Sequence, residues 1–416
     1  MFEYTREAFL DFMKDYPITD EDILNATNEA YQEGLISEEE YRVVLKSLKA
    51  HLNQVLPKEE VDLLSKEDFN LYYQNMLKLI TQSFSFLSYA EQNELSVEEL
   101  CEYKKRERLY LLATKAKLKG LTVRKLTYPF IYTMLPVYHL FKNISVKVNG
   151  KVPRQFPWKR KPIILAVSHI GMYDTEVILQ AVKKHFYLLS DDEEFMYRTF
   201  DGWYFDRNGV IYVDNDDRVD KRVAFETTLK YLKAKKNVLW CPEGIWNLDI
   251  NKIILYLAFG IINAAYQADA LILPLGIEQF DQEKGAHFII NIGDLIDVKS
   301  CFKDSLSEKE NKIMVASILR DSMATLKFNA WGSMRRDEIE KDYYQKFVEK
   351  RLAEWPYFNA EKIKKRTFIP SNIILNEDAF KHLSHLDIGS HNAFLARIKK
   401  DYDHELEEKD KLLVRP

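Results

Sequence analysis

A histidine and an aspartate five positions apart, His169 and Asp174, are the residues whose types and spacing best suit catalysis. They follow the apolar run PIILAV at residues 162–167, which predicts a buried strand, and functional sites of open α/β sheets lie at such strand ends. Gly171 lets the chain turn tightly, so the carboxylate at the start of the next helix reaches back to the imidazole. In an acyl transfer, the carboxylate would fix the imidazole tautomer while the other ring nitrogen takes the proton of an attacking hydroxyl.

This spacing alone is weakly specific, because His382 and Asp387 repeat it in a segment to which we assign no role. The alternative interpretation of His169 and Asp174 is structural: a hydrogen-bonded histidine that precedes a capped helix. Three further blocks downstream favour the catalytic interpretation. They are GVIYVD at 209–214, CPEGIW at 241–246 and LPLG at 273–276.

In order and spacing, the four blocks resemble the motifs of the glycerolipid acyltransferase superfamily, the lysophosphatidic acid acyltransferases and their relatives. Those motifs are an H-x4-D box, a G-x-x-(F/Y)-V block, a P-E-G block and a late strand that carries a proline. The resemblance covers roughly residues 145–300. It implies that a fatty acyl thioester of coenzyme A or acyl carrier protein is the co-substrate, with no further cofactor.

The resemblance also implies roles for matching residues. His169 would be the general base and Asp174 its orienting partner. Glu243 and Gly244 would shape the acceptor pocket, and Pro274 would hold its strand near the acyl chain.

Two departures concern the acceptor. After the block that begins at Gly209, Asn215 stands in an acidic stretch where the family often has a basic residue, and the next cation is Arg218. Ile245 and Trp246 follow the P-E-G block in place of threonine and arginine. Neither asparagine nor tryptophan replaces an arginine that grips phosphate as a bidentate fork.

The acceptor therefore stays open among several chemical classes. A glycolipid, a sugar hydroxyl or a lysophospholipid with a larger head group becomes plausible, with Trp246 stacking on the head group. Alternatively Arg218, Lys221 or Arg222 reaches into the site.

The pattern along the chain predicts an α/β fold with a mostly parallel sheet flanked by helices. Expected strands lie at 143–150, 162–168, 186–190, 209–214, 237–241, 270–280 and 287–297, and expected helices at 175–185, 220–236 and 253–269. The predicted parts are a helical N-terminal region (1–120), an interfacial apolar segment (121–143), the α/β acyltransferase domain (144–304) and a helical C-terminal extension (305–416).

Charge is distributed unevenly. Residues 1–60 hold six basic and fourteen acidic side chains, whereas residues 102–125 hold nine basic and two acidic ones, directly before an aromatic, apolar segment at 126–141. A polybasic run beside such a segment is typical of an interfacial anchor, so we expect residues 102–141 to contact a membrane surface. A buried helix pair under the catalytic domain is the alternative. Because no window reaches the ~18 uninterrupted apolar residues of a spanning helix, the contact is expected from one side.

Composition excludes several classes of protein. The net charge of −4 gives no attraction to nucleic acid, and neither a G-x-G-x-x-G nor a P-loop motif is present. The three cysteines, Cys101, Cys241 and Cys301, show no C-x-x-C spacing, which suits a reducing cytoplasm. No apolar leader is evident at the N-terminus, and no histidine cluster has the acidic partners of a metal site. We therefore expect a cytoplasmic, peripherally membrane-associated enzyme without a metal.

Two other functions compete with this prediction. One is a non-catalytic membrane-binding module, which the intact His169–Asp174 pair disfavours. The other is a thioesterase or hydrolase that uses the same base on water, although the sequence lacks the G-x-S-x-G elbow. Cys241 as a thiol nucleophile is a further alternative, disfavoured by the proline that follows it.

Overall fold

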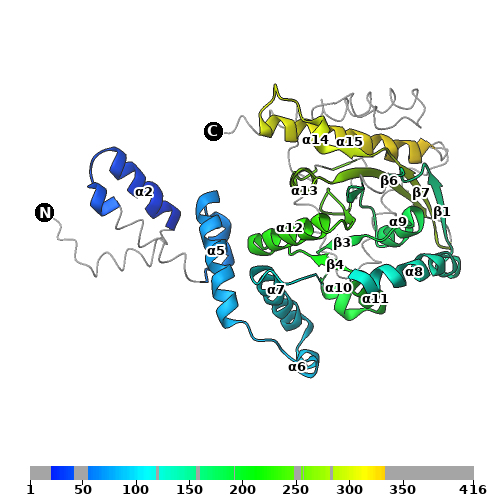
Figure 1. Cartoon of the computed structure of the whole chain (residues 1–416), viewed down its shortest axis with the longest axis horizontal. Coiled ribbons are helices and arrows are strands. Elements are labelled where there is room, and N and C mark those ends of the chain that lie inside the picture. The colour runs from blue at the N-terminus through cyan, green and yellow to red at the C-terminus, as the bar shows by residue number, and fades with distance from the viewer. Residues whose placement is uncertain are drawn as a thin grey trace. The chain divides into compact units, whose positions relative to one another are not determined.

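The computed structural model describes residues 20–41, 55–118, 121–155, 160–191, 193–247, 254–255, 257–281 and 284–332 (Figure 1). The His382–Asp387 pair and most of the predicted C-terminal extension lie outside these residues. The chain forms two compact units, of which the first comprises Met1–Lys117 with Asp214–Val223. The second comprises Leu118–Val213 with Ala224–Pro416. The segment at 214–223 thus leaves the predicted catalytic domain and joins the N-terminal helices.

The second unit is built on one eight-stranded sheet with the order β1-β7-β6-β2-β5-β3-β4, in which β8 also pairs with β6. All neighbours run parallel except β6 with β7 and β6 with β8. The strands are β1 (Ile144–Asn149), β2 (Ile163–Val167), β3 (Tyr187–Ser190), β4 (Val210–Tyr212), β5 (Val238–Trp240), β6 (Leu271–Asp281), β7 (Ala286–Ile292) and β8 (Ile296–Asp297). The predicted α/β class with a mostly parallel sheet is confirmed.

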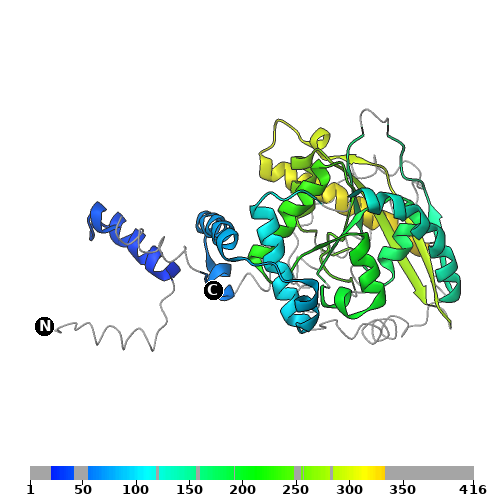
Figure 2. The ribbon, with the colours of Figure 1, turned by 60° about the horizontal axis from the view of Figure 1, so that its bottom comes forward.

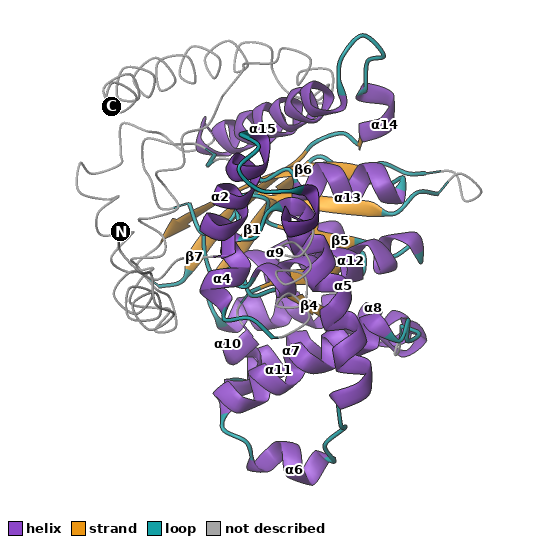
Figure 3. Cartoon of the chain, turned by 90° about the vertical axis from the view of Figure 1, so that its left-hand side faces the viewer, coloured by secondary structure: helices purple, strands orange, loops and turns teal. Residues whose placement is uncertain are grey.

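Helices cover both faces of this sheet (Figures 1 and 3). They are α8 (Leu121–Phe141), α9 (Asp174–Val182), α10 (Glu193–Arg198), α11 (Phe200–Asn208), α13 (Gly260–Ala268), α14 (Val298–Cys301) and α15 (Glu308–Gly332), together with the later part of α12 (Arg218–Lys233). The sequence did not predict α10 and α11 between β3 and β4. It also predicted a helix from residue 253, whereas α13 begins only at Gly260.

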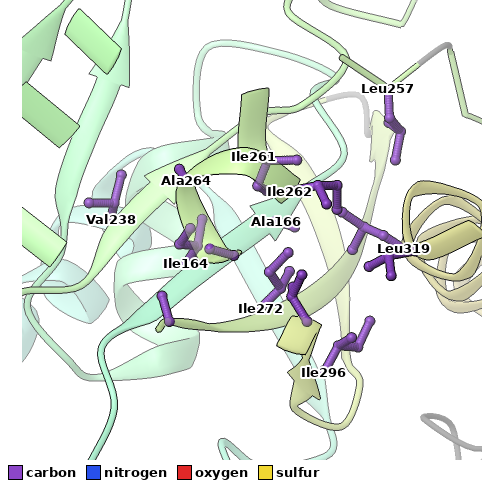
Figure 4. Packing of buried hydrophobic residues seen from close by; sticks show 14 of the residues in the cluster. Ile164, Ala166, Val238, Leu257, Ile261, Ile262, Ala264, Ile272, Ile296 and Leu319 are labelled. Carbon is purple, nitrogen blue, oxygen red and sulfur yellow. The ribbon is translucent and has the colours of Figure 1, made fainter. Parts of the chain in front are cut away.

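The alternation of side chains along β2 distributes the core between two layers. Ile164 and Ala166 face a cluster that includes Ile261 of α13 and Leu319 of α15 (Figure 4). Ile163 and the other odd-numbered residues of β2 face a second cluster with side chains of α8 and α9. Because both faces are covered, β2 is apolar throughout, as is usual for a central parallel strand.

The first unit is helical over its described N-terminal part. It contains α2 (Asp20–Gln32), α4 (Lys58–Leu63), α5 (Lys66–Ser83), α6 (Tyr89–Glu94) and α7 (Val97–Ala113), which Figure 2 draws in blue to cyan. Ser37 and Glu40 form a capping box, with reciprocal hydrogen bonds of 2.8 and 3.3 Å. Ser96 caps α7 in the same manner. Among the described helices of the chain, none is both long and apolar enough to cross a membrane.

Candidate active site

The turn after β2 places His169 at the carboxyl end of the central strand. Ser168, which is fully buried, first ties this turn to β6, because its hydroxyl accepts a hydrogen bond of 3.1 Å from the main-chain N–H of Ile277. The next residue, His169, therefore leaves the sheet from a fixed point. Its side chain is 27% exposed, so part of the imidazole is open to a substrate.

Asp174 holds the imidazole from the first turn of α9. Its Oδ2 lies 2.8 Å from His169 Nδ1 and also accepts the main-chain N–H groups of Ile170 at 2.7 Å and Gly171 at 3.1 Å. The side chain is only 4% exposed. Because an ionised carboxylate oxygen can only accept, Nδ1 carries the ring proton and Nε2 is the unprotonated nitrogen of the neutral imidazole. The structure thus brings the two predicted catalytic residues into the arrangement of an oriented general base.

Glu243 holds the main chain of the histidine. Its two carboxylate oxygens accept the N–H of His169 at 3.1 Å and that of Leu255 at 2.7 Å. On the other side of the histidine, the N–H of Asn247 donates to the His169 carbonyl at 2.7 Å. Residues 241–247 therefore hydrogen-bond to both main-chain groups of His169, its N–H and its carbonyl. Burial raises the pKa of Glu243, while the charge of Lys327 acts in the opposite direction.

Trp246 lies against the imidazole. The ring centroids of Trp246 and His169 are 5.8 Å apart at an interplanar angle of 82°, an edge-to-face contact. Trp246 is only 3% exposed and Ile245 is also buried. Trp246 thus encloses one side of the His169 ring. Its indole is buried and does not form an open surface on which a lipid head group could stack. Gly244 makes the turn between them and Glu243, with φ +70°, a conformation that glycine adopts without strain.

The comparisons with known proteins concern the segment that contains this site. The family model described as Acyltransferase matches residues 144–278. Over this segment the chain is therefore similar to acyltransferases. A similar solved structure is the 1-acyl-sn-glycerophosphate acyltransferase PlsC from Thermotoga maritima, with 17% identity and a TM-score of 0.37, over 60% of this chain and 97% of that chain. The search of curated proteins finds no match.

Pro274 and Cys241 border the histidine turn in the acyltransferase domain. Pro274 stands on β6 in register with Ala166 of β2, three positions before the histidine. Cys241 follows β5, and burial, reinforced by the carboxylates of Asp174 and Glu243, raises the pKa of its thiol well above the ordinary value. The thiolate is therefore strongly disfavoured, which supports a structural role for this cysteine over a nucleophilic one.

The remaining predicted acceptor residues are Gly209, Asn215 and Arg218. Gly209, with φ +113°, ends α11 and leads into β4. Asn215 and Arg218 belong to the N-terminal unit. There the Arg218 guanidinium donates to the carbonyls of Val61 at 3.0 Å and Leu64 at 2.7 Å, and it lies over the Phe69 ring at 4.2 Å.

Sequence reasoning missed three contributors to the acyltransferase site: Asn247, Leu255 and Lys327. Asn247 and Leu255 act through main-chain N–H groups, which every residue except proline carries, so no side-chain pattern in the sequence predicts them. Lys327 lies beyond the four motifs in sequence. Across the described residues, no group of three or more His, Cys, Asp or Glu side chains is arranged to hold a metal ion.

Proposed function

We propose that this chain transfers a fatty acyl group from an acyl thioester to a hydroxyl of a lipid acceptor, with His169 as the general base. The observation that carries this proposal is the contact between His169 Nδ1 and an Asp174 oxygen that is itself held by two main-chain N–H groups. This arrangement leaves Nε2 as a proton acceptor on a partly exposed ring. The acyltransferase domain supplies the class of reaction.

The proposed reaction needs no covalent enzyme intermediate. Nε2 of His169 takes the proton of the acceptor hydroxyl as its oxygen attacks the thioester carbonyl. Collapse of the tetrahedral adduct breaks the C–S bond, and the proton on the imidazolium passes to the departing thiolate. Asp174 stabilises the transient imidazolium, and Glu243 keeps the histidine main chain in place during both steps.

The acceptor is a lysophospholipid or a related lipid or glycolipid, and the donor is an acyl thioester of coenzyme A or acyl carrier protein. The head group of the acceptor should not need an arginine that binds a terminal phosphate through two hydrogen bonds. Ile245 and Trp246 occupy the positions after the P-E-G block and are buried and uncharged. Arg218, the next candidate cation, already donates to the carbonyls of Val61 and Leu64. A zwitterionic or neutral head group fits these residues better than lysophosphatidic acid.

The membrane contact is proposed to lie on α8. This helix turns Tyr128, Leu135 and His139 inward, where they are buried. Its outward stripe follows helical spacing and consists of exposed apolar side chains: Phe130, Met134, Val137, Leu140 and Phe141. A stripe of this kind suits insertion into the head-group boundary from one side, at the cytoplasmic face of a membrane.

The polybasic part of residues 102–141 contributes less to that contact than its composition suggests. Lys105 of α7 lies 2.7 Å from the Asp214 carboxylate, and Arg108 lies 3.2 Å from that of Asp220, both within the N-terminal unit. Lys104 pairs with Glu107 in the same helix. These three cations hold the unit together, so the apolar stripe of α8 carries the proposed membrane affinity.

The test is acylation by purified protein and by His169→Ala. Each is incubated with a radiolabelled acyl-CoA or acyl carrier protein and a panel that contains lysophosphatidic acid, lysophosphatidylcholine, lysophosphatidylethanolamine and a glycolipid. Labelled lipid from the wild type alone is expected. Equal product from both proteins would overturn the role of His169.

Two other outcomes identify the competing functions. Thioester loss without acylated lipid would assign a hydrolase. No turnover by either protein, with vesicle binding intact, would assign a non-catalytic membrane module.

A further inference from the structure

Helices α8 and α9 lie side by side on the same face of the sheet (Figure 1). The hydroxyl of Tyr128 in α8 donates to the carbonyl of Lys184 at 2.5 Å, just after the end of α9. Near the other end of α8, His139 lies beside Glu176 and Gln180 of α9. The two helices therefore run in opposite directions, and the last turn of α8 lies beside the first turns of α9.

The imidazole of His139 is enclosed between the two helices, with only 2% of its side chain exposed. Its Nδ1 lies 2.5 Å from Oε1 of Gln180, and because an amide oxygen can only accept, Nδ1 is the donor. Its Nε2 lies 3.6 Å from Oε2 of Glu176. That distance is too long for a hydrogen bond but brings the carboxylate into ion-pair range of the ring. One histidine of α8 thus contacts two successive turns of α9.

These polar contacts fix where α9 lies along α8. The interface also contains apolar contacts, in which Leu135 of α8 shares a cluster with Val177 and Ile178 of α9. Apolar burial is not directional, so it tolerates a small slide of one helix along the other. The same slide would separate the His139 N–H from Gln180 and leave a buried donor unsatisfied, which is unfavourable. The hydrogen bond therefore selects one relative position of the two helices.

The turn of α9 that His139 contacts first is the turn that carries Asp174. This aspartate stands two positions before Glu176. Its Oδ2 lies 2.8 Å from His169 Nδ1 and accepts the main-chain N–H of Ile170 at 2.7 Å. A displacement of the first turn of α9 along α8 would change the distance between this carboxylate and the imidazole. The polar contacts of His139 therefore bear on the geometry of the base.

We propose that His139 is a positioning residue of the acyltransferase site: from α8 it fixes the first turns of α9, so that Asp174 stays within hydrogen-bond distance of His169. This inference rests on the proposed function of His169 as the base. It extends the site to a residue outside the matched segment 144–278. It also connects the base to the helix whose outward apolar stripe is proposed to contact the membrane.

The test compares His139→Leu with His139→Asn, and Tyr128→Phe serves as the matched control. Leucine keeps the site apolar and filled but makes neither polar contact. The asparagine amide can take the place of Nδ1 and donate to Gln180. Tyr128→Phe removes a hydrogen bond of the same helix to the carbonyl of Lys184, which lies at the end of α9 remote from Asp174.

Initial rates are measured in the full chain, with the acyl thioester and the lipid of the acylation panel that the wild type uses best. The temperature is one at which circular dichroism shows all four proteins folded. H139L is expected to lower kcat on the order of 10–10²-fold, because a misplacement of about 1 Å can cost 10²-fold. The KM for both substrates should stay within about twofold of the wild type, since no binding contact is removed.

The other two variants decide whether the effect depends on position. H139N should recover most of kcat, and Y128F should match the wild type. A wild-type kcat in H139L would overturn the proposal. A loss in Y128F as large as that in H139L would assign the effect to the general stability of the helix pair and overturn it as well. So would a kcat of H139N as low as that of H139L, because the hydrogen bond to Gln180 would then have no role.

A nitrogen NMR measurement needs no turnover and separates this inference from the proposed function. In protein labelled with ¹⁵N-histidine, the ring shifts of His169 report which nitrogen carries the proton, and His169→Ala assigns them. The wild type and Y128F should show the Nδ1–H form that Asp174 selects, whereas H139L should shift toward a mixture of both tautomers. An unchanged Nδ1–H form in H139L would refute the inference whatever the protein acylates. A wild type without that form would refute the contact on which the inference depends, whereas activity in His169→Ala would refute the proposed function alone.

Discussion

The carboxylate of Glu243 accepts a hydrogen bond from the main-chain N–H of His169, although 74 positions separate the two residues. The contact joins the end of β2 to the loop after β5, which are neighbouring parallel strands. The family motif places the glutamate beside the acceptor. In this structure the same glutamate first of all fixes the segment that carries the base, so its substitution should affect turnover more than acceptor affinity.

Glu243→Gln should change how stability depends on pH. Burial raises the pKa of Glu243 in the folded protein above its ordinary value, so the folded state binds this proton more tightly than the unfolded chain does. The free energy of unfolding therefore decreases as pH rises from the ordinary carboxyl range through the raised pKa. Glutamine does not titrate and lacks this contribution. In urea titrations between about pH 4 and 7, the wild type should gain stability relative to E243Q as the pH is lowered; parallel curves would contradict the assignment.

Asp174→Asn should abolish most of the activity while it preserves the fold. An asparagine oxygen in the place of Oδ2 can still accept from His169, Ile170 and Gly171, but the charge that stabilises the imidazolium is gone. Its amide nitrogen would then occupy the place of Oδ1, which is buried without a hydrogen-bond partner among the described residues. We expect kcat to fall on the order of 10³–10⁴-fold, by analogy with the triad aspartate of serine proteases.

The matched control for this substitution is Asp269→Asn. Asp269 lies partly exposed at the end of α13 and pairs with Lys161 at 3.0 Å, away from the histidine turn. Its variant should keep wild-type kcat. Comparable losses in both variants would show that charge on the domain, and not the contact with His169, determines the rate.

Much of the fold could be predicted from the sequence because the necessary information is local. The continuous apolar run of β2, the turn at Gly171 and the amphipathic α9 indicated where His169 and Asp174 would meet. Ser37 with Glu40 indicated a helix start by the spacing of a capping box, which the structure contains. Each of these features depends on neighbours a few positions apart, which periodicity and capping rules describe.

The errors arose where distant groups compete with local preference. Residues 253–259 are apolar and predict a helix together with 260–268, yet the N–H of Leu255 donates to the Glu243 carboxylate instead of to a helical carbonyl. The sequence did not indicate the short helices α10, of six residues, and α11, of nine residues. Both consist largely of charged and aromatic side chains and show little apolar periodicity. Nor does the sequence show which face of α8 is buried, since Tyr128 and Phe130 are both aromatic and only packing distinguishes them.

Aspartates on the outward stripe of α8 should weaken membrane binding. Phe130 and Phe141 are 70% and 81% exposed, so their replacement removes no core contact. Transfer of a phenyl side chain from water contributes about 1.5–3 kcal/mol, and the double variant F130D/F141D should bind vesicles on the order of 10²-fold more weakly. Flotation with vesicles of phosphatidylcholine and phosphatidylglycerol measures the effect. The control is Val148→Asp, at a partly exposed valine of β1; equal binding by all three proteins would place the membrane contact elsewhere.

Arg218→Ala should distinguish an acceptor-binding arginine from a structural one. Its guanidinium donates to the carbonyls of Val61 and Leu64 and lies over the Phe69 ring, all within the N-terminal unit. Loss of these charge-assisted contacts should cost roughly 1.5–3 kcal/mol of stability and speed hydrogen exchange of α4 and α5. The KM for the lysolipid should remain within about twofold, because the sequence position after the G-x-x-Y-V block is here used for packing and not for phosphate.

The neighbouring Lys221→Met provides the comparison, because Lys221 is exposed on the same helix and should affect neither property. A large rise in KM for phosphate-bearing acceptors in R218A, with unchanged exchange in α4 and α5, would return Arg218 to the acceptor site. It would also favour lysophosphatidic acid over a lipid with a larger head group. Faster hydrogen exchange in α4 and α5, with an unchanged KM for the lysolipid, would show that Arg218 does not bind the acceptor. The choice of lipid would then depend on the shape of the site around His169 and Trp246.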